Sequence, residues 1–208
     1  MSDIKLIGID LGATNIRAGI VQKGILHTIQ TKKINSAGSI EEVLADFYLL
    51  IDALLDKEVV AIGIGVPSVV DLSKGIVYDV QHIPSWKEVP LKEILEKKYH
   101  LPVFVNNDAN CFALGEFHFG KGRGKSDMIG LTIGTGLGAG VIVNKHLLAG
   151  PNCGVGEFGM VDYLEHNYEY YASGQYFMHK YNVKGQEVFD RAKAGDKLAQ
   201  EYYAQMGT

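Results

Sequence analysis

The sequence predicts an α/β protein of two related lobes, of which the second is incomplete within the 208 residues. The main observation is a repeat. Residues 7–26 read IGIDLGATNIRAGIVQKGIL and residues 129–148 read IGLTIGTGLGAGVIVNKHLL, so the copies lie 122 residues apart (129 − 7) and are identical at seven of 20 aligned positions. Each copy has the pattern of an apolar strand, a tight Gly/Thr turn and a second apolar strand, which favours a duplicated hairpin. The alternative is that two glycine-rich hairpins resemble each other by chance.

The first copy opens a run of elements in the order βββαβαβα. Ser39 and Glu42 have the spacing of a capping box, which predicts a helix from Ile40 onward. Asp108 is placed to cap the last helix of the run, and the lobe closes near Gly120. The predicted strands span residues 5–10, 15–21, 25–33, 59–66 and 102–105, and the predicted helices span about 40–56, 91–98 and 109–119.

The second copy is followed by a different pattern. Residues 121–125, KGRGK, read as a linker and a solvated loop, and the second hairpin covers 128–148. A turn-rich, aromatic stretch follows at 150–171, and helices are predicted at about 172–181 and 186–205. No counterpart of the strands at 59–66 and 102–105 is found here. We therefore expect lobes at 1–120 and 121–208, with the second one partial through truncation of the chain or of the gene.

Composition and charge argue against a nucleic-acid or membrane partner and favour the cytoplasm as the compartment. The net charge is −4, which gives no electrostatic footprint for a nucleic acid or a membrane surface. No run of 18 apolar residues is present, and the first residues do not have the pattern of a secretory signal. Cys111 and Cys153 have no partners at metal-ligand spacing, and buried thiols in a reduced, cytoplasmic protein are the expectation.

The two turns of the repeat are candidate phosphate sites. In the first turn, Asp10-Leu-Gly-Ala-Thr14, the carboxylate of Asp10 is suited to hold Mg²⁺ through water. Gly12 allows a phosphate to approach the backbone, and Thr14 adds a hydroxyl donor. The second turn supplies Gly134, Thr135 and Gly136. Neither turn is a Walker loop, because no G-K-[ST] follows, and neither leads into a helix as G-x-G-x-x-G does.

With these turns, several further motifs resemble one known family. DLGATN and IGTGLGAG are similar to the phosphate hairpins of the actin, sugar-kinase and heat-shock-ATPase superfamily. The motifs GIGVP at 63–67, NDAN at 107–110, ALGE at 113–116, GEFG at 156–159 and YASG at 171–174 resemble the ROK (repressor, open reading frame, kinase) family, in family order. The resemblance runs from Ile7 to about Gly174. It implies two ribonuclease-H-like lobes in an actin-like ATPase fold, and a glucokinase-like enzyme that moves the γ-phosphoryl of ATP onto a hexose or N-acetylhexosamine hydroxyl.

The resemblance also implies roles for individual residues. Asp108 would be the base that takes the proton of the sugar hydroxyl, and its alternative is a plain helix cap. Asn107 would bind sugar hydroxyls, and its alternative is an ordinary turn residue. Glu157 and Glu169 match two sugar-binding carboxylates of the family, against the alternative of solvated side chains. The remaining positions implied to face the sugar are Ser68 and His82.

The chain departs from the family pattern at three places. Met160 stands where the family has a zinc-binding His, and the cysteine cluster that should follow is absent from 164–169, so we predict no zinc site. We expect tyrosines to pack in place of the metal and the two nearby histidines to be ordinary surface or core residues; these are Tyr163, Tyr168, Tyr170 and Tyr171, and His166 and His179. His82 replaces the usual Asn, and Ser68 the usual Gly, which leaves the identity of the sugar open.

Three functions follow from these observations. The first is an ATP- and Mg²⁺-dependent sugar kinase, for which the resemblance implies a homodimer. Its activity could require more of the protein than this fragment contains. The second is a sugar-sensing ROK repressor, which is disfavoured because only four residues precede Lys5 and leave no room for a helix-turn-helix. The third is a non-catalytic sugar-binding homologue, which Met160 and His82 favour.

Overall fold

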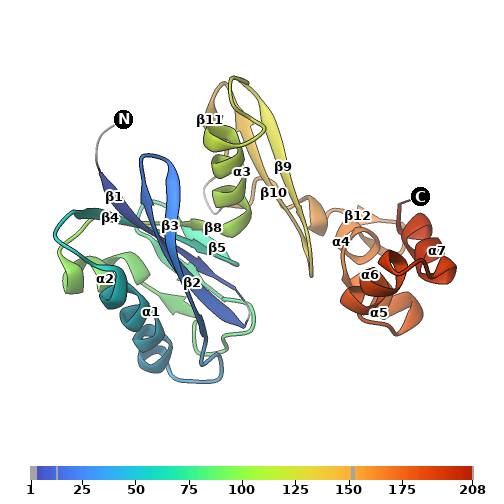
Figure 1. Ribbon diagram of the computed structural model, residues 1–208, viewed down its shortest axis with the longest axis horizontal. Coiled ribbons are helices and arrows are strands. Elements are labelled where there is room, and N and C mark those ends of the chain that lie inside the picture. Colours follow the sequence, from blue (N-terminus) through green and yellow to red (C-terminus); the bar gives the residue numbers. More distant parts are fainter. Residues whose placement is uncertain (1–3, 13, 151–152, 208) are drawn as a thin grey trace.

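A five-stranded mixed sheet forms the base of the first lobe. The computed structural model describes residues 4–12, 14–150 and 153–207. The strand order is β3-β2-β1-β4-β8, with β1 antiparallel to β2 and parallel to β4, and β4 parallel to β8. Helices α1 and α2 pack on this sheet (Figure 1). The bounds are β1 Lys5–Leu11, β2 Asn15–Gln22, β3 Ile25–Lys33, α1 Ile40–Leu54, β4 Val59–Val66, α2 Leu91–Tyr99, β8 Val103–Asn107 and α3 Asp108–Phe119.

These elements confirm the predicted order βββαβαβα within one or two residues at most ends. The capping box is present as predicted: the Ser39 hydroxyl accepts from the Glu42 N–H, and the Glu42 carboxylate accepts from the Ser39 N–H at 2.8 Å. A single apolar core fills the lobe, and Phe47 of α1 stacks on the fully buried Trp86 with ring centroids 5.6 Å apart. Burial of this apolar surface is the main stabilising term of the lobe.

A small second sheet between β4 and α2 was not predicted. Its strands are β5 Val69–Asp71, β6 Ile76–Tyr78 and β7 Glu88–Val89, in the order β5-β6-β7. Each strand buries one valine, namely Val70, Val77 and Val89. Strands of two or three residues are too short to show the alternation from which a strand is recognised, so the sequence gives no signal for them.

The second copy of the repeat forms a hairpin of the same kind as the first. β9 Met128–Ile133 pairs antiparallel with β10 Leu137–Val143, and β10 with β11 His146–Leu147. The pairs Leu11↔Ile16 and Ile133↔Leu137 leave four residues (12–15) in the first turn and three (134–136) in the second. The ungapped alignment of the two copies is therefore right for the first strand and shifted by one residue in the second strand.

Helix α3 packs directly on bare backbone of the second hairpin. Gly130 and Gly140 are paired across β9 and β10, and a Cβ on either would lie 3.1 Å or less from the Cβ of Ala113. Gly138 likewise faces Ala109, at 3.1 Å. The glycines of the second copy thus have two roles. Gly138 and Gly140 let α3 approach the sheet, whereas Gly134 and Gly136 form the turn. Figure 1 shows α3 between the first sheet and this hairpin.

Four helices, rather than the two predicted, form a cluster after the hairpin. They are α4 Tyr168–Ala172, α5 Gln175–Tyr181, α6 Gly185–Lys193 and α7 Lys197–Met206, and a 3-10 turn at Phe158–Met160 precedes them with the short pair β12 Asp162–Tyr163 and β13 His166–Asn167. The predicted helix at 186–205 is interrupted at 194–196, where Gly195 has φ +93° and the Asp196 carboxylate caps α7. These helices share a small core of their own around Phe177 and Val188.

The architecture is therefore α/β, as predicted, and its buried side chains fall into separate clusters. The main cluster belongs to the first sheet with α1 and α2, whereas Ala113 and Phe117 of α3 cluster with Ile142 of the hairpin. Helix α3 thus packs on both halves of the chain, and the boundary at residue 120 stays a prediction. Within the described residues, none of the helices has the length and apolar character needed to cross a membrane.

Candidate functional site

The strand registers bring Asp10 and the NDAN motif to one edge of the first sheet. Asp10 lies opposite Gly65 of β4, and Gly65 lies opposite Asn106 of β8, so Asp10 and Asn106 are two strands apart. At the usual spacing between neighbouring strands this corresponds to about 10 Å. Asn107 and Asp108 follow directly at the carboxyl end of β8. Polar side chains from separate parts of the sequence are thus gathered at the carboxyl ends of parallel strands, where ligands of open α/β sheets commonly bind.

Asn107, and not Asp108, is the N-cap of α3. The Asn107 Oδ1 accepts from the N–H groups of Ala109, at 3.0 Å, and Asn110, at 3.2 Å. The prediction that Asp108 caps this helix is wrong by one residue, because Asn and Asp are equally good caps and the helix starts at Asp108 itself. The Asp108 Oδ1 still accepts from the Ala109 N–H at 2.8 Å. Asp108 is therefore held at the positive end of α3, beside the sheet edge.

The carboxylates predicted to form the site influence one another electrostatically. Desolvation by the surrounding protein raises the pKa of Asp108, and the charge of Asp10 raises it further. Desolvation also raises the pKa of Glu157, to which the charges of Asp108 and then Glu169 add. A carboxylate is a stronger base when its ionised form is disfavoured in this way. The charges of Asp10, Asp108, Glu157 and Glu169 therefore act on one another.

Glu169 is bound to the second hairpin turn. Its Oε2 accepts from the Leu137 N–H at 2.9 Å, and Gln175 Nε2 lies 3.5 Å from its Oε1. A Cβ on Gly136 would come within 2.6 Å of the same carboxylate, so a side chain there would displace the Glu169 carboxylate. Glu169 thus contacts the predicted phosphate turn directly, a contact that the sequence did not predict.

The two turns use the N–H groups of their first glycines internally. The Gly12 N–H donates to the Asn15 carbonyl at 2.9 Å, and the Gly134 N–H donates to the Gly136 carbonyl at 3.0 Å. This shared feature fits a common origin of the hairpins. Because the Gly134 N–H is used inside the turn, the N–H groups of Thr135 and Gly136 are, within the described residues, the candidates to donate hydrogen bonds to an anion at the second turn. Thr14 is exposed, and its hydroxyl accepts from Asn15 Nδ2 at 3.2 Å.

Asp10 fits the requirements of a Mg²⁺ ion that accompanies a polyphosphate. Its side chain is 56% exposed, and in the described part of the chain it forms an ion pair with Arg17 at 3.4 Å. Mg²⁺ usually keeps several waters and takes one or two carboxylates together with phosphate oxygens. The described residues contain no group of three or more His, Cys, Asp or Glu side chains that could enclose a metal by themselves. A single exposed carboxylate at a phosphate turn agrees with a Mg²⁺ ion that is held mainly by water and phosphate oxygens.

Ser68 lies at this site, whereas His82 is not connected to it. The Ser68 carbonyl accepts from Asn107 Nδ2 at 3.4 Å, so the end of β4 and the end of β8 are joined here. His82 is exposed in the turn before Trp86, in a left-handed conformation with φ +66°. Among the described residues it makes no hydrogen bond to another predicted site residue. Its role at the sugar stays a prediction.

The tyrosines that follow Met160 pack on one another as predicted. Tyr163 stacks on Tyr168 with centroids 4.7 Å apart and meets Tyr171 edge to face. Tyr170 lies between His166 and His179, with centroid distances of 3.8 and 4.6 Å. Both histidines thus belong to an aromatic stack. The absence of zinc is a prediction that metal analysis can test.

A contact near the start of α3, between Asn106 and Cys153, was missed by the sequence analysis. Asn106 Oδ1 accepts from the Asn107 N–H at 2.8 Å, from Asn110 Nδ2 at 3.2 Å and from the Cys153 thiol at 3.6 Å. Cys153 belongs to the core of the first lobe although it follows the second hairpin. The sequence carries no signal for this contact, because it joins segments that are distant along the chain.

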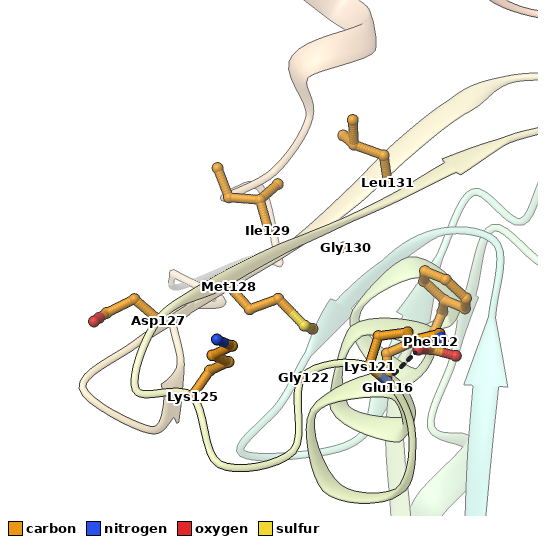
Figure 2. A pocket seen from close by; sticks show the side chains of 10 residues that line it. All are labelled: Phe112, Glu116, Lys121, Gly122, Lys125, Asp127, Met128, Ile129, Gly130 and Leu131. Atoms are coloured by element: carbon orange, nitrogen blue, oxygen red, sulfur yellow. Dashed lines mark hydrogen bonds between the residues drawn. The ribbon is translucent and has the colours of Figure 1, made fainter.

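A hollow on the described surface lies away from these residues. It has a volume of about 440 Å³ between α3 and β9 and contains none of the predicted site residues. Figure 2 shows Lys121 and Lys125 at its rim, with the Lys121 N–H donating to Glu116. Its wall is β9, the edge strand of the second sheet. Since the carboxylates lie elsewhere, we assign the candidate site to the sheet edge and not to this hollow.

Comparison with known proteins agrees with this geometry. The model of the ROK family matches residues 6–208. A glucokinase of Thermotoga maritima is 30% identical, and the alignment covers 96% of this chain and 73% of that protein. A xylose repressor of Caldicellulosiruptor bescii is 36% identical over 74% of this chain and 40% of the repressor. Two further bacterial glucokinases are covered over 49% and 51% of their length, so the chain spans about half of several curated relatives.

Solved structures give the same result for the fold. A ROK family glucokinase from Streptomyces griseus, crystallised in complex with glucose and AMPPNP, superposes with a TM-score of 0.82 at 27% identity. The match covers 97% of this chain and 75% of that structure. The α/β architecture is therefore that of the ROK structures over three quarters of the length of this relative.

Proposed function

This chain belongs to the ROK family, and on that premise we propose that it binds ATP and a hexose or N-acetylhexosamine and takes part in transferring the γ-phosphoryl group to a sugar hydroxyl. The observation that carries the proposal is the gathering of Asp10, Asn107 and Asp108 at one edge of the first sheet. Desolvation and then the charge of Asp10 raise the pKa of Asp108, and desolvation and then the charge of Asp108 raise that of Glu157. Relatives that match the chain include glucokinases, and the S. griseus relative holds glucose and an ATP analogue.

In the proposed reaction Asp108 is the general base. Its carboxylate accepts the proton of the attacking hydroxyl, the sugar oxygen forms a bond to the γ-phosphorus, and ADP leaves with the electrons of the broken P–O bond. The raised pKa of Asp108 suits this step because it makes the carboxylate a better proton acceptor. Below that pKa the base is protonated, so the rate falls in acid.

The remaining residues bind and orient the reactants in this proposal. Gly12, Thr14, Gly134, Thr135 and Gly136 contact the phosphates, and Asp10 holds Mg²⁺ through water, which offsets the charge that develops on the phosphates. The sugar lies against five side chains that offer amide, hydroxyl, imidazole and carboxylate groups to its hydroxyls, namely Asn107, Glu157, Glu169, Ser68 and His82. Exclusion of water from the closed site would prevent hydrolysis of ATP.

A coupled ADP-release assay with glucose, fructose, mannose and N-acetylated hexosamines tests the proposal. We expect turnover with at least one sugar, and loss of about three orders of magnitude in kcat for Asp108→Asn, in the range seen when a general base is removed. Sugar binding, measured by calorimetry, should persist in this variant. Turnover that survives Asp108→Asn would refute the assignment of the base.

Sugar binding without phosphoryl transfer is the second candidate. It is favoured by Met160, which is 62% exposed where the resemblance expects His. It is also favoured by His82, which among the described residues has no hydrogen bond to another predicted site residue. Calorimetric binding of a sugar with no ADP release for any member of the panel would select this function. The oligomeric state, for which the family suggests a homodimer, is open to measurement by light scattering.

A further inference from the structure

Residues 153–157 form a crossing segment that carries Glu157 and is attached to the first lobe through Cys153. This cysteine follows the second hairpin in sequence, yet its side chain is 4% exposed and lies in the main core of the first lobe. Its thiol lies 3.5 Å from the Val70 carbonyl and 3.6 Å from Asn106 Oδ1, and it donates toward these oxygens. The segment therefore crosses from the second half of the chain into the first at this residue.

The backbone at Cys153 has a conformation that favours glycine. Its φ is +58°, in the left-handed region where a Cβ is sterically unfavourable. A side chain persists in such a conformation when its surroundings hold it there. Here the surroundings are the buried core and the two acceptors of the thiol. These contacts of the Cys153 side chain hold its backbone in the left-handed conformation.

Asn106 connects Cys153 to the start of α3. Its Oδ1 collects donors from the Asn107 backbone, the Asn110 side chain and the Cys153 thiol, which belong to the end of β8, the first turn of α3 and the crossing segment. Asn106 is two residues before Asp108. Since one oxygen joins all three segments, a shift of the crossing segment also disturbs the support of the Asp108 backbone.

The crossing segment has a second fixed point three residues after Cys153. Gly156 has φ +102°, and a Cβ on it would lie 2.2 Å from the Ala139 carbonyl of β10. Glu157 follows immediately. The segment is thus held to the first lobe at Cys153 and to the second hairpin at Gly156, and these two points determine where the Glu157 carboxylate lies.

We propose that Cys153 and Asn106 are positioning residues, whose contact sets the place of Glu157 and so the affinity for the sugar. The contact itself needs no ligand, whereas its effect on the sugar rests on the function proposed above. The two parts are tested by separate measurements.

The first measurement is the rate at which N-ethylmaleimide labels Cys153 in the native chain, with peptide mapping to separate it from Cys111. We expect Asn106→Ala to raise the labelling rate of Cys153 about tenfold, since loss of one of the two acceptors of its thiol makes local opening easier. Asn35→Ala, an exposed Asn before α1, is the control and should leave the rate unchanged. An unchanged rate in Asn106→Ala would overturn the proposal, and so would an equal rise at both cysteines, which indicates general opening of the lobe.

The second measurement compares two substitutions that relieve a left-handed backbone. Cys153→Gly removes the thiol, and His100→Gly makes the same backbone change at the end of α2, where φ is +54°. We expect Cys153→Gly to raise the sugar KM about tenfold (~1.4 kcal/mol) with kcat within about twofold of the parent. His100→Gly should not change KM, and Cys153→Ser, which keeps a donor, should restore part of the affinity. A parental KM in Cys153→Gly would refute the positioning role.

The two results separate this inference from the proposed function. If no sugar is phosphorylated or bound, the labelling rates still decide whether the Cys153–Asn106 contact holds the segment, and the failure falls on the kinase assignment. If a sugar is phosphorylated but Cys153→Gly behaves like His100→Gly, the kinase assignment stands and the positioning role is wrong.

Discussion

Replacement of Asn107 separates its two roles, as the cap of α3 and as a predicted ligand of the sugar. In Asn107→Ala the N–H groups of Ala109 and Asn110 lose the acceptor that now lies 3.0 and 3.2 Å away. Loss of an Asn cap costs about 1 kcal/mol, within a range of about 0.5–2 kcal/mol. The bond from Asn107 Nδ2 to the Ser68 carbonyl is long, at 3.4 Å, and adds little. For a chain of this size we expect Tm to fall by roughly 2–4 °C.

Asn107→Ser is the matched control. Serine caps helices about as well as asparagine, so the free energy of unfolding should stay within about 0.5 kcal/mol of the parent. It cannot supply the amide, so sugar affinity should fall as it does in Asn107→Ala. Urea unfolding gives the first quantity and calorimetry the second. If Asn107→Ser destabilises the chain as much as Asn107→Ala, capping is not the source of the effect and the reasoning fails.

Two other changes have defined signs. The pKa of Asp108 is raised above its ordinary value of 3.8. The folded state therefore binds the carboxyl proton of Asp108 more tightly than the unfolded chain does. As a result, the contribution of Asp108 to stability falls as pH rises from 3.8 through the raised pKa. Asp108→Asn should therefore be more stable than the parent at pH 7 in thermal unfolding, with a gain that shrinks toward pH 3.8; a constant gain would contradict this origin. Gly156→Ala, whose Cβ would lie 2.2 Å from the Ala139 carbonyl at φ +102°, should lose at least about 3 kcal/mol or fail to fold. Gly154→Ala has open space and should change stability by less than about 1 kcal/mol in the same urea titration, and similar losses in both would show that the contact is not limiting.

Local signals in the sequence were sufficient for most of the first lobe. The capping box at Ser39 and the apolar strands are set by residues within a few positions of each other, and all of them form as predicted. Placement of the cap of α3 failed by one residue because Asn107 and Asp108 have equal preference for the position. The break between α6 and α7 had a signal in Gly195 and Asp196, but the apolar spacing across it still resembled one helix.

Contacts between distant segments could not be predicted in the same way. The shift of one residue between the two hairpins depends on how many residues their turns accommodate, which an ungapped alignment cannot show. The bond from Glu169 to Leu137 spans 32 residues, and the contact of Cys153 with Asn106 spans 47. Each depends on the path of the chain in three dimensions and not on local preference.

The seat of α3 on the glycines of the second hairpin has a mechanical consequence. No side chain separates Ala113 from the backbone of Gly130 and Gly140. Because packing this close resists sliding, we expect the helix and the hairpin to move together. Twelve residues make α3 about 18 Å long, so tilting it by about 10° sweeps its far end through about 3 Å. Asp108 occupies the first residue of this lever. Any rotation of the hairpin toward the first sheet would therefore also change the orientation of the Asp108 carboxyl group.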